Sequence, residues 1–155
     1  MNSQTKKGGI SVFDVAESLL KLHGPMTTMK LQKLVYYCQA WALVWDEKPL
    51  FPEKILAWAN GPVVRELFKH FQGEYEVSST KTGDHNKLDG EQQATVVGVL
   101  NFYGKKSSQW LSDLTHMEAP WRDARKGLRE DQRGDEEITL ASLAEYYGSL
   151  HPAKQ

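Results

Sequence analysis

Apolar residues recur at steps of three and four positions along most of the chain, and this spacing gathers side chains on one face of an α-helix. The periodicity predicts a mainly α fold, a compact single-domain bundle of about six to seven helices. The expected helices cover residues 12–23, 28–45, 61–71, 90–103, 108–115, 120–126 and 140–147.

Residues suited to begin a helix precede most of these segments. A Ser, Thr or Asp side chain can accept a hydrogen bond from the free N–H groups of the first helical turn. The candidate N-caps are Ser11, Thr27 or Thr28, Asp89, Ser107 or Ser108, and Thr139.

Prolines interrupt the helical pattern after residue 45. Pro49 and Pro52 exclude a regular helix, because proline lacks the backbone N–H that a helix interior requires. We expect a short two-stranded hairpin or an extended segment near residues 50–59. Gly61-Pro62 is expected to open the third helix, since a proline in the first turn loses no hydrogen bond.

The stretch from Thr27 to Phe71 is the expected core of the fold. Its helix over 28–45 is apolar around more than half of its circumference, so it should lie at the centre. Lys30, Gln32 and Lys33 fall on the other, polar side of that helix. The stretch also contains the single cysteine, Cys38, and three of the five tryptophans: Trp41, Trp45 and Trp58.

Two polar segments separate the later helices. Residues 72–90 predict a long, mobile surface loop, with a brief edge strand near Tyr75 and Val77. Residues 127–137 carry charges of both signs and predict a solvated loop. Residues 1–10 are expected to be a flexible lead-in, and residues 11–150 a single helical domain.

Composition excludes several classes of protein. Lys and Arg number 19 and Asp and Glu number 20, so a net charge of -1 gives no general case for nucleic-acid or membrane binding. A local basic patch stays open. A single cysteine cannot form an internal disulfide, which suits a cytoplasmic location. No apolar run is long enough to span a membrane.

Catalytic and metal-binding patterns are absent from the sequence. It contains no HExxH, CxxC, GxSxG or phosphate-binding glycine loop, so we expect neither an enzyme nor a cofactor. Asp113, His116 and Glu118 form the densest polar group, and a metal-dependent hydrolase there is a weak hypothesis. Cys38 is interpreted as a small buried hydrophobe rather than a nucleophile.

Five blocks in order resemble the Panacea domain of the SocA-like antitoxin family, which includes phage-associated GepA-type proteins. They are KLQKLVYYCQAW (30–41), KPLF (48–51), AWANGPVV (57–64), LTHMEAPWRDAR (114–125) and ITLASLAEYY (138–147). Each block alone is short, but their order and spacing follow the family pattern over almost the whole chain. The shared residues that we interpret as mainly structural are Leu31, Leu34, Trp58, Gly61, Pro62, Pro120 and Trp121.

The resemblance implies an antitoxin that neutralises a cognate toxin by direct protein–protein binding. In some versions of the family the antitoxin delivers its toxin to an ATP-dependent protease. The polar residues in the shared blocks are candidates for contact with the partner: Lys30, Gln32, Lys33, Tyr37 and His116. A DNA-binding regulator of phage or prophage genes is the alternative. The toxin, its contact face and the oligomeric state stay open.

Overall fold

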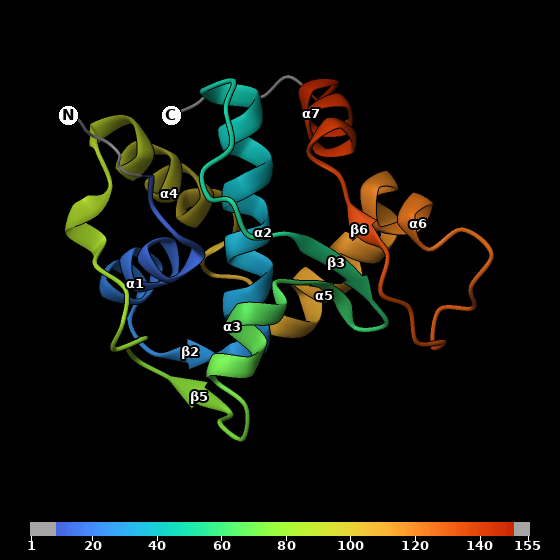
Figure 1. Ribbon diagram of the computed structural model, residues 1–155, viewed down its shortest axis with the longest axis horizontal. Coiled ribbons are helices and arrows are strands. Elements are labelled where there is room, and N and C mark those ends of the chain that lie inside the picture. The colour runs from blue at the N-terminus through green and yellow to red at the C-terminus, as the bar shows by residue number, and fades with distance from the viewer. Residues whose placement is uncertain (1–8, 151–155) are drawn as a thin grey trace.

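The computed structural model describes residues 9–150, and Figure 1 shows one long helix, α2, surrounded by shorter ones. The predicted mainly α fold is confirmed. Within the described residues the α-helices are α1 (Val12–His23), α2 (Thr28–Trp45), α3 (Arg65–His70), α4 (Gly90–Tyr103), α5 (Ser108–Met117), α6 (Ala119–Ala124) and α7 (Leu140–Gly148).

Short strands form two antiparallel sheets around this bundle. In the smaller sheet, β2 (Met26–Thr27) pairs with β5 (Glu76–Val77). In the larger sheet, β3 (Ile55–Trp58) lies between β4 (Gly61–Val63) and β6 (Glu137–Ile138). The expected hairpin therefore exists at 55–63, later than predicted, and a third strand from the end of the charged 127–137 segment joins it.

The prediction that Gly61-Pro62 opens a helix is wrong, because both residues belong to β4. Gly61 directly follows the two-residue turn of the hairpin. Its φ of +121° lies in the region of backbone conformation that favours glycine. Pro62 lies opposite Ala57 in the hairpin. The N–H of Ala57 does not face Pro62, because it donates to the carbonyl of Glu136 on the opposite side of β3. The pairing at Pro62 therefore requires no N–H from the proline.

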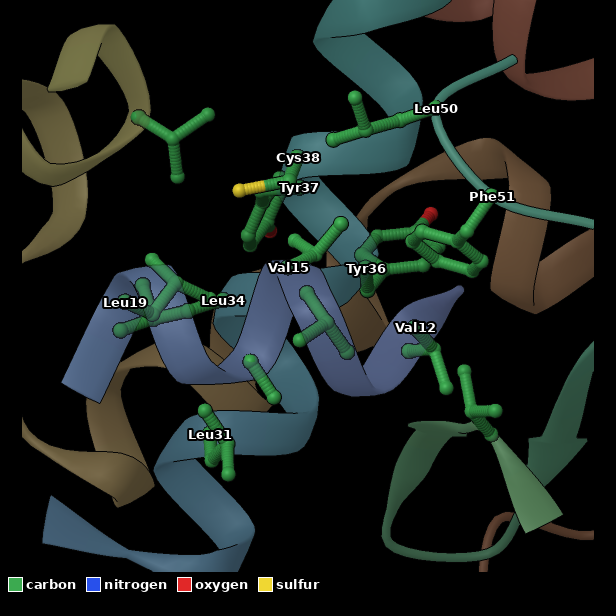
Figure 2. Packing of buried hydrophobic residues seen from close by; sticks show 14 of the residues in the cluster. Val12, Val15, Leu19, Leu31, Leu34, Tyr36, Tyr37, Cys38, Leu50 and Phe51 are labelled. Carbon is green, nitrogen blue, oxygen red and sulfur yellow. The ribbon is translucent and has the colours of Figure 1, made fainter. Parts of the chain in front are cut away.

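Helix α2 is the centre of the structure, as the sequence predicts. Every residue from Leu31 to Ala42 is buried, because α1, α4, α5, α7 and β4 all pack on it. Figure 2 shows the resulting cluster, in which side chains from α1 and α2 meet those of Leu50 and Phe51. Cys38 is fully buried there, and burial raises the pKa of its thiol.

The side of α2 that the sequence predicts to be polar is not open to solvent at Gln32 and Lys33, which are 4% and 0% exposed. The Gln32 amide instead binds both the N–H and the C=O of Val64, at 2.8 and 3.1 Å. Gln39 binds the backbone around Leu50 and Phe51 in the same way. These internal hydrogen bonds explain how a helix can be buried on all sides while carrying polar residues.

A carboxylate and several tyrosines connect α2 to the C-terminal helices. Glu118 accepts hydrogen bonds from the hydroxyls of Tyr37 and Tyr147, each at 2.7 Å. Tyr36 lies 2.9 Å from the Tyr147 hydroxyl, and Tyr103 stacks on Tyr37. Burial raises the pKa of Glu118, although both tyrosine hydrogen bonds oppose that shift. The cluster therefore attaches α7 and the start of α6 to α2.

The helix starts follow the predicted caps. Ser11, Thr27, Asp89, Ser107 and Thr139 each accept a hydrogen bond from a backbone N–H in the first turn. The expected flexible lead-in falls mainly on residues 1–8, which lie outside the described residues, and Ile10 is buried in the core.

The 72–90 segment is attached to α1 through a buried carboxylate. Glu17 accepts hydrogen bonds from the N–H and hydroxyl of Thr80, at 2.7 and 2.8 Å, and from Ser79. Burial alone would raise the pKa of Glu17, but these hydrogen bonds outweigh it and the pKa is lowered. The segment is therefore a largely exposed loop that is held to the core at Val77, Thr80 and Leu88, which are all buried.

Replacing Tyr147 with Phe tests the tyrosine cluster. The change keeps the ring but removes one donor to Glu118 and the partner of Tyr36, so we expect a loss of about 1–3 kcal/mol in unfolding free energy. Urea denaturation measures it. The control is Tyr146→Phe on the same helix, where the ring is only partly buried and the loss should stay below about 0.5 kcal/mol. Equal losses in the two variants would contradict the assignment.

Candidate functional site

A groove of about 740 Å³ opens between α3, the first turn of α2 and the β3–β4 hairpin. We call it the hairpin groove. Its apolar lining consists of Met29, Trp58, Val63, Leu67, Phe68 and Phe71. Its polar lining includes Arg65, Glu74, Arg133 and Asp135. Concave, mainly apolar sites with a few polar groups are the usual form of a binding site.

An aromatic pair, the exposed Phe68 and the partly buried Trp58, lines the groove. Leu67 and Phe71, four residues apart, turn inward from α3 and are buried. Phe68 instead points outward, and 42% of its surface is exposed. The ring of Trp58 packs edge-on against Phe68, with 5.0 Å between centroids. Exposed aromatic groups beside a concave apolar surface are typical anchors of protein interfaces.

One carboxylate joins the two sides of the groove. Asp135 accepts a hydrogen bond from the Trp58 indole at 2.9 Å, and the guanidinium of Arg65 on α3 pairs with its other oxygen. The indole hydrogen bond, followed by the bond from Arg65, lowers the pKa of Asp135. Asp135 therefore connects the hairpin to α3 and fixes the orientation of Trp58.

A buried arginine positions the segment that carries Asp135. Arg125 is 3% exposed and lies over the ring of Trp121. Its guanidinium donates to the carbonyls of Ala57, at 2.9 Å, and of Arg129, Glu130 and Gln132. The charged 127–137 segment is therefore built around an interior cation, and its last residues form one wall of the groove.

The five predicted partner-contact residues do not form one surface. Tyr37 is buried and donates to Glu118, Gln32 binds Val64, and Lys33 is enclosed. Lys30 is half-buried and donates to the carbonyl of Gly104 at 2.6 Å, and burial lowers its pKa. His116 stacks on Trp121 with 4.0 Å between centroids, and burial lowers its pKa too. Their contact with a partner stays a prediction.

The predicted structural residues occupy the core and the base of the hairpin. Leu31 and Leu34 are fully buried. Pro120 and Trp121 are buried at the start of α6, and the Trp121 indole donates to the carbonyl of Trp58 at 2.8 Å. Trp58 differs from these residues, because it also lines the groove.

Lys33 lies directly beneath the hairpin turn. Its amine is buried without a hydrogen-bond partner. A Cβ atom placed on Gly61 would lie 2.6 Å from Cε of Lys33 and 3.2 Å from Oγ1 of Thr115. Burial lowers the pKa of Lys33 to about 7. The close packing against Gly61 thus depends on a side chain that is costly to protonate.

Two of the three residues in the weak metal hypothesis, His116 and Glu118, make separate contacts. Glu118 is bound by tyrosines, whereas His116 stacks on an indole. Within residues 9–150 no group of three or more His, Cys, Asp or Glu side chains is close enough to hold a metal ion. None of the helices described for this chain has the length and apolar character needed to cross a bilayer.

Sequence reasoning missed the polar edge of the groove. Arg65, Arg133 and Asp135 come from segments interpreted as an ordinary helix and a solvated loop. The apolar spacing over residues 61–71 predicts one stripe that includes Leu67, Phe68 and Phe71. Phe68 directly follows Leu67, however, and neighbours on a helix point about 100° apart. That adjacency is the one signal that could have identified Phe68 as exposed.

Titration of Lys33 should be visible in the stability of the protein. The folded state binds this proton more weakly than the unfolded chain, so the unfolding free energy should rise from pH 7 to 9 by up to about 1.4 kcal/mol per pH unit. Lys33→Met should remove this rise and should stabilise the protein at pH 7 by about 1–3 kcal/mol. Urea unfolding at both pH values measures the effect.

The matched control for this experiment is Lys69→Met, which removes a fully exposed lysine on α3. It should leave the pH dependence of the wild type unchanged. If Lys33→Met keeps the wild-type rise between pH 7 and 9, the amine is not neutralised in the folded state.

A comparison with protein families identifies one match. The profile of the family described as antitoxin SocA-like, Panacea domain, matches residues 31–122. No curated protein and no solved structure matches the chain. The matched segment covers more than half of the sequence and runs from α2 to α6. It contains the hairpin and α3, and with them most of the groove. The chain therefore belongs to the SocA-like antitoxin, Panacea domain family.

Proposed function

We propose that this protein is an antitoxin that neutralises a cognate toxin by binding it directly, with the hairpin groove as the contact surface. The observation that supports the proposal is that most of the groove lies within the segment that matches the antitoxin family. The groove residues from Gln32 to Glu74 all lie inside the matched segment 31–122. A family of antitoxins implies a protein partner, and the exposed, concave apolar surface suits one.

The chemistry of the groove specifies the kind of segment that it would bind. Met29, Trp58 and Phe68 offer apolar contact area, so the toxin should contribute apolar side chains. Arg65 and Asp135 form an ion pair at the edge of the groove. When a bound partner covers them, each charge therefore keeps its counter-charge, and both side chains can still form hydrogen bonds to the partner. We therefore propose an amphipathic toxin segment, apolar at its centre and polar at its edges.

Binding through this groove would neutralise a toxin by occlusion. The lining comes from the first turn of α2, the hairpin, α3 and the loop at 133–135, and the hairpin is fixed to α2 by Gln32 and to α6 by Trp121. A surface held in this way is pre-organised and loses little conformational entropy on binding. Delivery to an ATP-dependent protease would be an additional step after the same contact.

The direct test is co-expression with the product of the adjacent reading frame. That product should stop growth when expressed alone, and growth should return when this protein is present. Occlusion should leave the amount of toxin unchanged, whereas delivery to a protease should lower it. A neighbouring product that is harmless alone, or that stays toxic in the presence of this protein, would refute the proposal.

Replacing Phe68 with Asp tests the groove itself. A charge at the aromatic pair should weaken toxin binding at least tenfold, about 1.4 kcal/mol, and should abolish rescue of growth. The matched control is Phe102→Asp on α4, because Phe102 is 45% exposed and Phe68 is 42% exposed. Calorimetry measures affinity, and thermal unfolding verifies the fold of both variants. Equal rescue by Phe68→Asp and wild type would place the contact elsewhere.

A further inference from the structure

A group of positive charges surrounds the loop between α4 and α5, outside the hairpin groove. Lys105 and Lys106 are exposed in this loop, immediately after the buried Gly104. Two side chains from the N-terminal part of the chain bind the carbonyl of Gly104. The Lys30 amine donates to it at 2.6 Å, and Nε2 of His23 donates to it at 3.1 Å. We call this group, together with Trp110, the lysine corner.

The two chain segments that form the lysine corner contain no acidic residue. The sequence has no Asp or Glu between Glu17 and Asp46, and none between Glu91 and Asp113, and these two acid-free segments meet at Gly104. None of the close ion pairs found within residues 9–150 includes one of its cations.

An exposed indole lies within this positive region. Trp110 is 43% exposed, and the amine of Lys106 lies 4.6 Å from the centre of its ring. A tryptophan on the surface beside cations combines an apolar contact with charge, which is the composition of an interface anchor. The first turn of α2 separates the corner from the groove, since Met29 lines the groove and Lys30 belongs to the corner.

We propose that the lysine corner binds an acidic segment of a partner protein, with Asp and Glu side chains on the lysines and an apolar side chain on Trp110. The charge distribution favours a short acidic segment over a nucleic acid. Of the 19 Lys and Arg residues, three lie in the corner, which leaves 16 against all 20 carboxylates. A long polyanion would extend from the corner over a surface that repels it.

The test is a titration of the isotope-labelled full-length protein with a short peptide of Asp and Glu around one Phe, followed by NMR. The peptide should shift the amide signals of residues 104–110 and the Trp110 indole signal, less so at high salt. A matched peptide with Asn and Gln in place of the acids should shift neither. Single- and double-stranded DNA of similar length are titrated in parallel.

Charge reversal locates the binding. The double variant Lys105→Glu, Lys106→Glu should bind the acidic peptide about tenfold more weakly or worse. The neutral pair Lys105→Gln, Lys106→Gln should lose less affinity. The control pair Lys69→Glu, Lys126→Glu changes exposed lysines elsewhere and should bind like wild type.

Three results would overturn the proposal. The first is an acidic peptide that binds no better than its neutral counterpart. The second is a control pair that loses as much affinity as the corner pair. The third is DNA that occupies residues 104–110 more tightly than the peptide, because the corner would then be a nucleic-acid surface.

Discussion

Hydrogen bonds from side chains of α2 to the backbone of neighbouring segments are the interaction on which the remaining structure depends. Gln32 satisfies both backbone groups of Val64, and Gln39 satisfies those around Leu50 and Phe51. Each glutamine replaces the strand partner that these buried segments lack. Because α2 is enclosed from Leu31 to Ala42, a polar residue there must either find such a partner or lower the stability of the fold.

This constraint links the core to the groove. The amide of Gln32 sets the backbone position at the start of α3, and Lys33 fills the space under Gly61 at the hairpin turn. Arg125 organises the opposite wall from the interior. The residues that shape the groove therefore act mainly from beneath it, and its exposed side chains, with Phe68 the most prominent, are supported by the buried Gln32, Lys33 and Arg125.

Periodicity in the sequence predicts most of the helices and their caps correctly, because both depend on residues close together in the chain. The prediction at Gly61-Pro62 was wrong, because glycine followed by proline suits a helix start as well as a strand that follows a tight turn. Only the pairing of Pro62 with Ala57 decides between the two. The groove could not be predicted. Asp135 and Trp58 are 77 residues apart in the sequence, and no local pattern in the charged loop predicts their hydrogen bond.

The single cysteine gives the fold an internal reporter. Cys38 is inaccessible to solvent and lies in the part of α2 that the neighbouring helices enclose. A thiol-modifying reagent can reach it only when these helices separate, and burial also keeps the sulfur in its unreactive thiol form. The modification rate of the unaltered protein therefore measures how often its centre opens, and a partner that holds the helices together would slow that rate without touching the cysteine.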